Sequence, residues 1–318
     1  MRTHEWLDMY PDEFFQERNN MPVCYMAYGP AEPHGVYNTM GVDFHNSYLL
    51  ARRAAETFGG IVAPPSAWHI QEQPYYDWEM DCCGMGMSLT TSVTEELFLH
   101  NMLYHIRNMD TKGFRAGILL SGHYLGGLNE GMRMLCEYYL RKTGSPLRLW
   151  AGYVNELDYP FLDSLGLPGS AQDHAGILET AMVMELKPES VHLDKIRQPL
   201  NVERHVAGDS GDYGLYCCPK TLESDLPYMT RELGARVVGR FVQRLGGLQQ
   251  ELLDGYEDRP RRYITMTETE EIWASFSYLT GRYWTCVQTR YEAEHGISPQ
   301  FPGFDVLEGK TWGKAGIF

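Results

Sequence analysis

Short apolar segments alternate with helix-like segments along most of this chain, and this alternation constrains its fold more than any other feature. Four apolar runs are short enough to be buried strands and end in glycine, proline or polar residues, at 22–27, 61–63, 116–120 and 147–154. The intervening and following patterns predict helices over 43–58, 91–110, 129–143, 173–186 and 231–245. Strands that alternate with helices are typical of a mostly parallel sheet. We therefore predict an α/β fold, a three-layer α/β sandwich.

Local signals predict where several helices begin and end. Asp43 stands at the expected N-cap of its helix, and the pair Gly59-Gly60 is expected to end it. Capping boxes are predicted for Ser92 with Glu95 and for Thr267 with Glu270. The second box opens a stripe of apolar residues that Gly296 is placed to end, and this predicts an additional C-terminal helix.

Composition excludes several classes of function. A net charge of −15 argues against a surface that tracks nucleic-acid phosphates. No run approaches the roughly 18 apolar residues of a membrane span, and the N-terminus lacks the apolar core of a signal peptide. The seven cysteines show neither framework spacing nor a Cys-x-x-Cys pair, so we expect reduced thiols and no thiolate zinc site. A cytoplasmic protein is expected.

Potential metal ligands follow the predicted strands. Glu32, His34 and His123 each come just after such a strand, and Asp43 precedes a helix. Ligands bind at the carboxyl ends of the strands in sheets of this kind. Glu32 and His34 are two positions apart, so in an extended segment both side chains point the same way. Glu179 and the pair Asp173-His174 open a later helix.

Each of these residues also has an ordinary interpretation. Glu32 could be a loop carboxylate, Asp43 an N-cap and His123 a structural histidine. Acidic residues are favoured at the start of any helix. Taken together, however, they offer carboxylate and imidazole ligands without thiolates, a set that suits zinc, manganese or iron.

The order and spacing of these motifs resemble those of the creatininase (creatinine amidohydrolase) family. Glu32-Pro-His34 is followed nine residues after the histidine by Asp43 in Gly-Val-Asp. The same order continues through the segments 59–65, 112–115, 121–123 and 174–180. The match runs from about residue 21 to about residue 248.

The resemblance implies a hydrolase with two divalent metal ions, zinc or manganese and in some cases iron, on an α/β sandwich. Glu32 and His123 would bind one ion, His34 and Glu179 the other, and Asp43 would bridge them. A metal-bound hydroxide would attack a carbonyl. His174 would protonate the leaving nitrogen or shuttle the proton, oriented by Asp173. The resemblance also implies a homo-oligomer, commonly a hexamer, that acts on a small molecule. From the charge and composition we expect no nucleic-acid or membrane partner.

Two departures argue against creatinine as the substrate. Leu125 stands where creatininase has a glutamate after its Gly-His-Tyr turn, and Ser170-Ala171 replaces a Trp-Asp pair. The loop at 66–88 carries aromatic residues of its own. Tyr124, Trp78, His69 and His45 are candidates for substrate contact, with surface or packing roles as the alternative.

The expected activity is therefore hydrolysis of a C–N bond in an amide, a cyclic amide or a formamide. Hydrolysis of a C–C bond in a keto-inositol ring, as in a 3-dehydro-scyllo-inosose hydrolase, is the alternative enzyme. The alternative outside the enzymes is a non-catalytic, metal-binding subunit of an assembly. We expect an N-terminal arm at 1–20, the metallohydrolase domain at 21–248 and a C-terminal extension at 249–318 that packs on the body or on a neighbouring subunit.

Overall fold

The computed structural model describes residues 2–32, 34–35, 37–70, 91, 93–124, 126–168, 174–197 and 222–280. Its sheet has four parallel strands in the order β2-β1-β3-β4, with bounds β1 Val23–Tyr28, β2 Ile61–Val62, β3 Ala116–Ser121 and β4 Arg148–Tyr153. The order places β1 and β3 at the centre of the sheet. All their residues are buried, as expected for strands covered on both faces.

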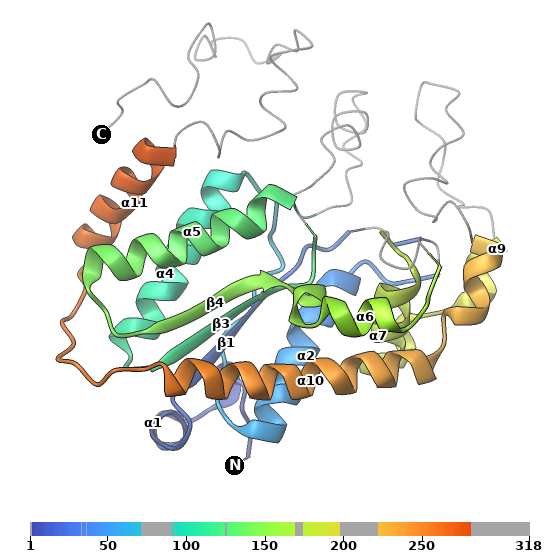
Figure 1. Ribbon diagram of the computed structural model, residues 1–318, viewed down its shortest axis with the longest axis horizontal. Helices are drawn as coiled ribbons and strands as arrows, with labels where there is room; N and C mark the ends of the chain where they lie inside the picture. Colours follow the sequence, from blue (N-terminus) through green and yellow to red (C-terminus); the bar gives the residue numbers. More distant parts are fainter. Residues whose placement is uncertain are drawn as a thin grey trace, which may run out of the picture.

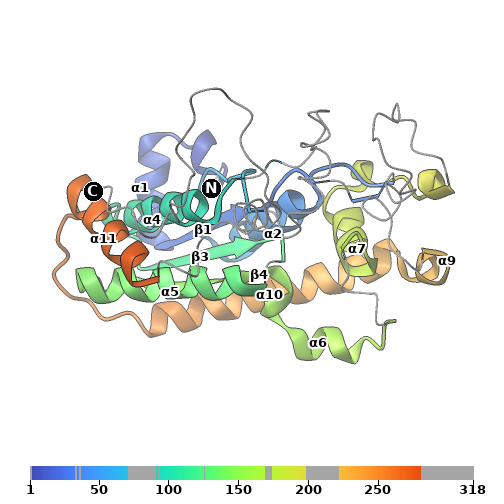
Figure 2. The same cartoon turned by 90° about the horizontal axis from the view of Figure 1, so that it is seen from above.

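Helices cover both faces of this sheet (Figures 1 and 2). Side chains of α4 (Glu95–Thr111), α5 (Gly126–Thr143) and α11 (Met266–Thr280) share one core with Cys24 and Met26 of β1. Side chains of α2 (Val42–Phe58), α7 (Ile177–Leu186) and α10 (Arg231–Asp254) share the other core with Val23 and Tyr25. Neighbouring residues of one strand thus enter opposite cores, which confirms the predicted α/β sandwich.

The remaining elements are short. They comprise α1 (Pro11–Asn20), α6 (Tyr159–Ser164), α9 (Leu222–Asp225) and the 3-10 helices η1 (Trp6–Asp8), η2 (Val154–Leu157), η4 (Pro188–Ser190), η5 (Leu193–Arg197) and η6 (Leu226–Tyr228). The N-terminal arm joins the sheet, because the backbone N–H of Val62 donates to the carbonyl of His4 over 2.8 Å. Trp6 and Phe14 of this arm pack with ring centroids 4.6 Å apart.

Helix α5 begins at Gly126 instead of residue 129, and α7 begins at Ile177 instead of residue 173. The starts of three further helices, for which caps were predicted, are also wrong. Gly41 is the N-cap of α2, and Asp43 lies inside the first turn without capping it. Helix α4 starts at Glu95 rather than near residue 91, and the hydroxyl of Thr94 accepts the N-cap bond from the backbone N–H of Leu97. Ser92 lies outside the described residues.

The third wrong start is that of α11. Its capping box pairs Thr265 with Glu268 instead of Thr267 with Glu270, and Glu270 bonds to His100 of α4 over 3.0 Å. Helix α11 packs on α4 and α5 and buries Trp273 and Phe276. Gly296 lies outside the described residues.

Helix α10 is longer than expected. Its pattern predicts an end near residue 245, yet the helix continues through Gly246-Gly247 to Asp254. A Cβ at Gly246 would lie 2.6 Å from the ring of Phe58, so this glycine permits close packing against α2. Beyond it, the side-chain amide of Gln249 accepts a 3.0 Å hydrogen bond from the hydroxyl of Tyr25 in β1. The sheet therefore holds this last part of the helix.

Candidate metal centre

The end of β1 and the start of α2 place the first group of polar side chains. After β1, the backbone N–H of Ala31 donates to Thr91 Oγ1 over 2.9 Å, and that of Glu32 donates to the carbonyl of Met40 over 2.7 Å. The hydroxyl of Ser47 in α2 donates to the carbonyl of Tyr28 over 2.8 Å. These bonds hold the segment with Glu32 and His34 next to the first turn of α2, which carries Asp43.

The turn after β3 places His123 against the same helix turn. A Cβ on Gly122 would lie 1.9 Å from the backbone oxygen of Asp43, so only glycine allows this approach. The hydroxyl of Ser121 accepts a 3.1 Å bond from the backbone N–H of His123. The first turn of α7 contributes Glu179, which contacts His34.

The two oxygens of Asp43 face two different histidines. Its Oδ1 lies 3.0 Å from His34 Nε2, and its Oδ2 lies 2.9 Å from His123 Nδ1. Glu32 Oε2 lies 3.3 Å from His123 Nδ1, and Glu179 Oε2 lies 3.5 Å from His34 Nε2. All five side chains are buried. The structure thus brings together the five predicted metal ligands, in two groups that share Asp43.

Burial and neighbouring charges strongly shift the pKa values of the five side chains. Burial raises the pKa of Glu32 and of Glu179 to about 7, and the charge of Asp43 adds to both increases. Burial alone would lower the pKa values of the histidines. The neighbouring carboxylates instead raise the pKa of His34 to about 10 and that of His123 to about 9. The two imidazolium groups outweigh burial and hold the pKa of Asp43 far below its usual value.

These residues fit divalent metal ions. Three carboxylates and two imidazoles, without a thiolate, suit zinc, manganese or iron. Glu32 Oε2 is buried and has no hydrogen-bond partner, which is costly in a folded protein unless another group satisfies it. His34 Nδ1 lies 3.0 Å from the carbonyl of Glu32, as expected for a ligating histidine whose second ring nitrogen is oriented by the protein.

His174 lies at the rim of this centre. Its side chain is 41% exposed, its Nδ1 is 3.9 Å from Glu32 Oε2, and its ring centroid is 4.3 Å from that of His34. A titratable side chain that touches both the buried centre and solvent can exchange protons with a bound molecule. Its predicted partner Asp173 lies outside the described residues.

The predicted substrate-contact residues lie in different places. Tyr124 is 46% exposed and packs edge-on against Tyr153, with centroids 5.5 Å apart. His69 is fully buried, with Nε2 3.1 Å from Ser121 Oγ. His45 Nε2 lies 3.0 Å from Lys187 Nζ, and burial together with that charge lowers its pKa to about 4. Trp78, Leu125 and Ser170-Ala171 lie outside the described residues.

Two residues of the site were not singled out from the sequence. The Tyr153 hydroxyl lies 3.5 Å from Glu179 Oε1, and the Tyr37 hydroxyl donates to the carbonyl of Ala175 over 2.8 Å. Tyr153 ends β4, so the rule that ligands bind at the carboxyl ends of strands could have found it. Tyr37 lies in a loop, and no sequence signal distinguishes it there.

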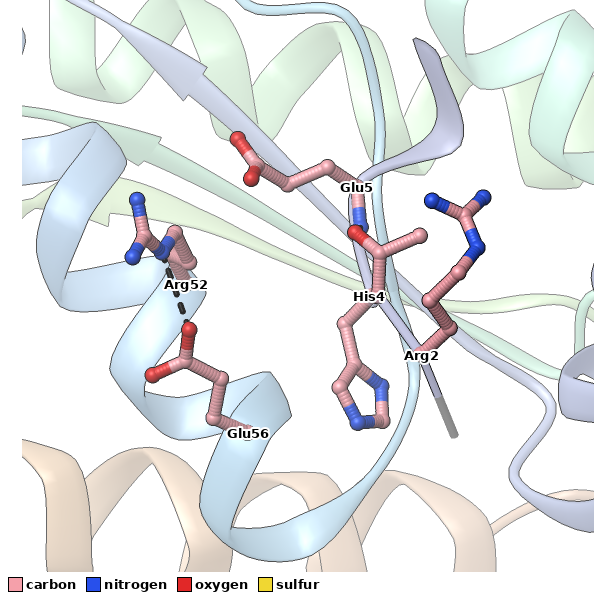
Figure 3. A pocket seen from close by; sticks show the side chains of 6 residues that line it. Arg2, His4, Glu5, Arg52 and Glu56 are labelled. Atoms are coloured by element: carbon pink, nitrogen blue, oxygen red, sulfur yellow. Dashed lines mark hydrogen bonds and ion pairs between the residues drawn. The ribbon is translucent and has the colours of Figure 1, made fainter. Parts of the chain in front are cut away.

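A separate pocket of about 340 Å³ lies at the N-terminal arm and is lined by Arg2, Thr3, His4, Glu5, Arg52 and Glu56 (Figure 3). It shares no residue with the metal centre. Its two arginines already have acidic partners, Glu13 for Arg2 and Glu56 for Arg52, each at 2.9 Å.

Among the described helices, none is long and apolar enough to cross a membrane.

Comparisons with known proteins agree with the fold. Creatinine amidohydrolase of Pseudomonas putida is 25% identical over 182 residues, which cover 55% of this chain and 68% of that protein. A creatininase structure named for manganese aligns with a TM-score of 0.60 at 20% identity, over 79% of this chain and 98% of that one. A mutant creatininase of Zn-Zn type aligns with a TM-score of 0.60 at 22% identity, over 79% and 98% of the two chains.

The family match spans most of the sequence. The model of the creatininase family, described as creatinine amidohydrolase, matches residues 8–247. This span includes every strand of the sheet and all five residues of the buried centre. The chain therefore belongs to the creatininase family of metal-dependent amidohydrolases.

Proposed function

We propose that this chain is a dinuclear metal-dependent hydrolase that cleaves a C–N bond in a small amide, cyclic amide or formamide. The observation that carries the proposal is the position of Asp43, whose two oxygens face His34 and His123 separately. A carboxylate that offers one oxygen to each of two ligand groups is suited to bridging two ions. Glu32 and His123 complete one group, and His34 and Glu179 complete the other.

Two divalent ions in such a centre polarise a substrate carbonyl and lower the pKa of bound water toward neutrality. The chain itself supplies the remaining steps. The backbone N–H of Ala175 donates to Glu179 Oε2 over 2.7 Å and orients that carboxylate. The exposed edge of His174 can hold a proton beside Glu32 and give it to the leaving nitrogen. Tyr124, exposed and packed on Tyr153, can contact the bound molecule.

The substrate is proposed to differ from creatinine. Leu125 cannot replace the charge of the glutamate that creatininase carries after its Gly-His-Tyr turn. Ser170-Ala171 cannot replace the aromatic face and carboxylate of a Trp-Asp pair. A pocket that lacks these groups favours another amide.

A substrate screen tests this proposal. Protein reconstituted with zinc or manganese is assayed against cyclic amides, ureides, formamides and keto-inositols, with the Asp43→Ala variant as control. We expect turnover of at least one C–N substrate by the wild type and none by the variant. Turnover restricted to keto-inositols would replace the C–N assignment with C–C hydrolysis. Equal rates for the wild type and the variant would contradict a metal-dependent reaction.

A further inference from the structure

The turn that carries His174 has an unusual backbone conformation. Within the described part of the chain, Ala175 is the single residue other than glycine with a positive φ, at 56°. An L-residue with a Cβ is disfavoured in this left-handed region, where glycine is at ease. Strained residues of this kind persist only where surrounding contacts hold them, and they cluster at active sites.

Both peptide groups of Ala175 are held by hydrogen bonds. Its N–H donates to Glu179 Oε2 over 2.7 Å, and its carbonyl accepts from the Tyr37 hydroxyl over 2.8 Å and from Thr180 Oγ1 over 3.3 Å. Ala175 is itself fully buried, so water does not substitute for these partners. The left-handed conformation thus directs the N–H to a predicted metal ligand and the carbonyl to Tyr37.

Tyr37 is well placed to hold this turn. Its side chain is 1% exposed, so the hydroxyl has a fixed direction. Its own carbonyl accepts from the backbone N–H of His192 over 2.7 Å, and the neighbouring N–H of Thr39 donates to the carbonyl of Ser190 over 2.9 Å. The loop between His34 and Asp43 is therefore anchored to the segment that follows α7, and Tyr37 extends from it to the turn that precedes α7.

We infer that Tyr37 is a positioning residue: its hydroxyl holds Ala175 in the left-handed conformation and thereby keeps His174 over the centre formed by Glu32 and His34. The inference rests on the proposed function in one respect, the role of His174 as proton donor. The hydrogen bond links the loop between two predicted ligands, His34 and Asp43, to the turn that carries the proton donor. It therefore couples the position of the donor to that of the ligands.

Tyr37→Phe removes the hydroxyl and leaves the buried ring in place. Tyr25→Phe is the matched control, because Tyr25 is also fully buried and donates one hydrogen bond of 3.0 Å, to Gln249 of α10. Hydrogen–deuterium exchange is measured on the peptide spanning residues 174–180, in zinc-loaded and in chelator-treated protein. We expect Tyr37→Phe to speed exchange of the Ala175 amide by about tenfold, the effect of losing one buried hydrogen bond, and Tyr25→Phe to leave it unchanged.

Turnover supplies the second readout. For an amide substrate found in the screen, Tyr37→Phe should lower kcat by about tenfold with little change in KM, because the ligands stay while the donor loses its position. The loss should be larger for substrates with poor leaving groups, which need the proton most. Tyr25→Phe should retain the wild-type kcat even if it lowers Tm.

Introducing Tyr37→Phe into an Ala175→Gly variant tests whether the effects arise from the left-handed conformation of Ala175. Glycine adopts this φ freely, so the turn needs less support from Tyr37. Tyr37→Phe should then speed exchange and lower kcat less than it does beside alanine.

Unchanged exchange at residues 174–180 in Tyr37→Phe would overturn the inference. Faster exchange with unchanged kcat would also overturn it, because Tyr37 would then hold the turn without serving His174. If no C–N substrate is turned over by the wild type, the proposed function fails. The exchange comparison then still decides whether Tyr37 holds the turn, because it needs no substrate.

Discussion

Asp43 is the residue on which the geometry of the centre depends. It lies in the first turn of α2, fully buried, with one oxygen 3.0 Å from His34 and the other 2.9 Å from His123. An aspartate at a helix start has the same sequence signature whether it caps the helix or faces a site. The two roles differ only in whether α2 starts at Asp43 or two residues earlier, and the sequence does not fix the start that closely. The N-cap assignment of Asp43 was therefore wrong, although its spacing from His34 was recognised as that of a ligand.

His174 is predicted to act in proton transfer and not in holding metal. Replacement by alanine should lower kcat by about 10²- to 10⁴-fold, the usual contribution of a positioned acid or base. Metal content should stay at the wild-type level, because the five buried residues remain. Steady-state kinetics together with elemental analysis checks both statements. Activity near the wild-type value would show that another group supplies the proton.

Metal binding is predicted to release protons. The metal-free centre holds them on His34 and His123, whose pKa values of about 10 and 9 lie above neutral pH. A metal ion takes only the neutral imidazole, so each bound ion displaces protons. Apparent affinity should therefore rise with pH from 6 to 8. Calorimetry of zinc binding in two buffers of different ionisation enthalpy measures the release, and identical heats in both buffers would contradict it.

Five elements meet at one end of the sheet and carry the site. The segments that follow β1 and β3 supply Glu32 and His123, and the last residue of β4 is Tyr153. The first turns of α2 and α7 supply Asp43 and Glu179. The alternation of strands and helices predicts this convergence, because parallel strands end at the same edge. The convergence of these side chains was therefore predictable from the order of the elements, whereas their division into two ligand groups was implied by the family resemblance.

Packing between elements was less predictable. Gly246 looks like a helix end in sequence, although it lies inside α10 where Phe58 leaves no room for a Cβ. Thr265 and Thr267 both precede a glutamate by three residues, and only tertiary contacts decide between them. Glu270 is taken by His100, which leaves Glu268 for the cap. Contacts such as the bond from Tyr37 to Ala175 join residues 138 positions apart, beyond the reach of local patterns.

Gly122 is predicted to be essential for the close packing of the turn after β3 against the first turn of α2. Gly122→Ala would place a Cβ 1.9 Å from the backbone oxygen of Asp43, so the helix start or the turn must move. We expect a loss of about 1–3 kcal/mol in the free energy of unfolding and a lower metal content.

Gly239→Ala in α10 is the matched control, because nothing lies within 4 Å of its added Cβ. It should leave metal content unchanged and stability unchanged or slightly higher. Urea denaturation and elemental analysis give both readouts. Equal stability and metal content in the Gly122→Ala variant and the wild type would contradict the close approach of the two elements.

At the scale of the whole molecule, the centre joins segments that are far apart in the sequence. Its ligands come from residues 32 to 179, and burying three carboxylates with two histidines is unfavourable unless the charges are compensated. Bound metal should therefore stabilise the native state by mass action. Removal by chelator should lower Tm by roughly 5 °C or more, and zinc or manganese should restore it. A Tm that is insensitive to chelator and to added metal would contradict this coupling.

Metal content measured for wild type and Asp43→Ala tests the shared carboxylate most directly. Glu185→Gln is the matched control, because Glu185 lies on α7 with Glu179 yet pairs with Arg53 and Arg231. After reconstitution and removal of free metal, elemental analysis should find about two transition-metal ions per chain in the wild type and in Glu185→Gln, and almost none in Asp43→Ala. Fewer than about one ion per chain in the wild type, or an Asp43→Ala variant that keeps both ions, would contradict a two-metal centre bridged by Asp43.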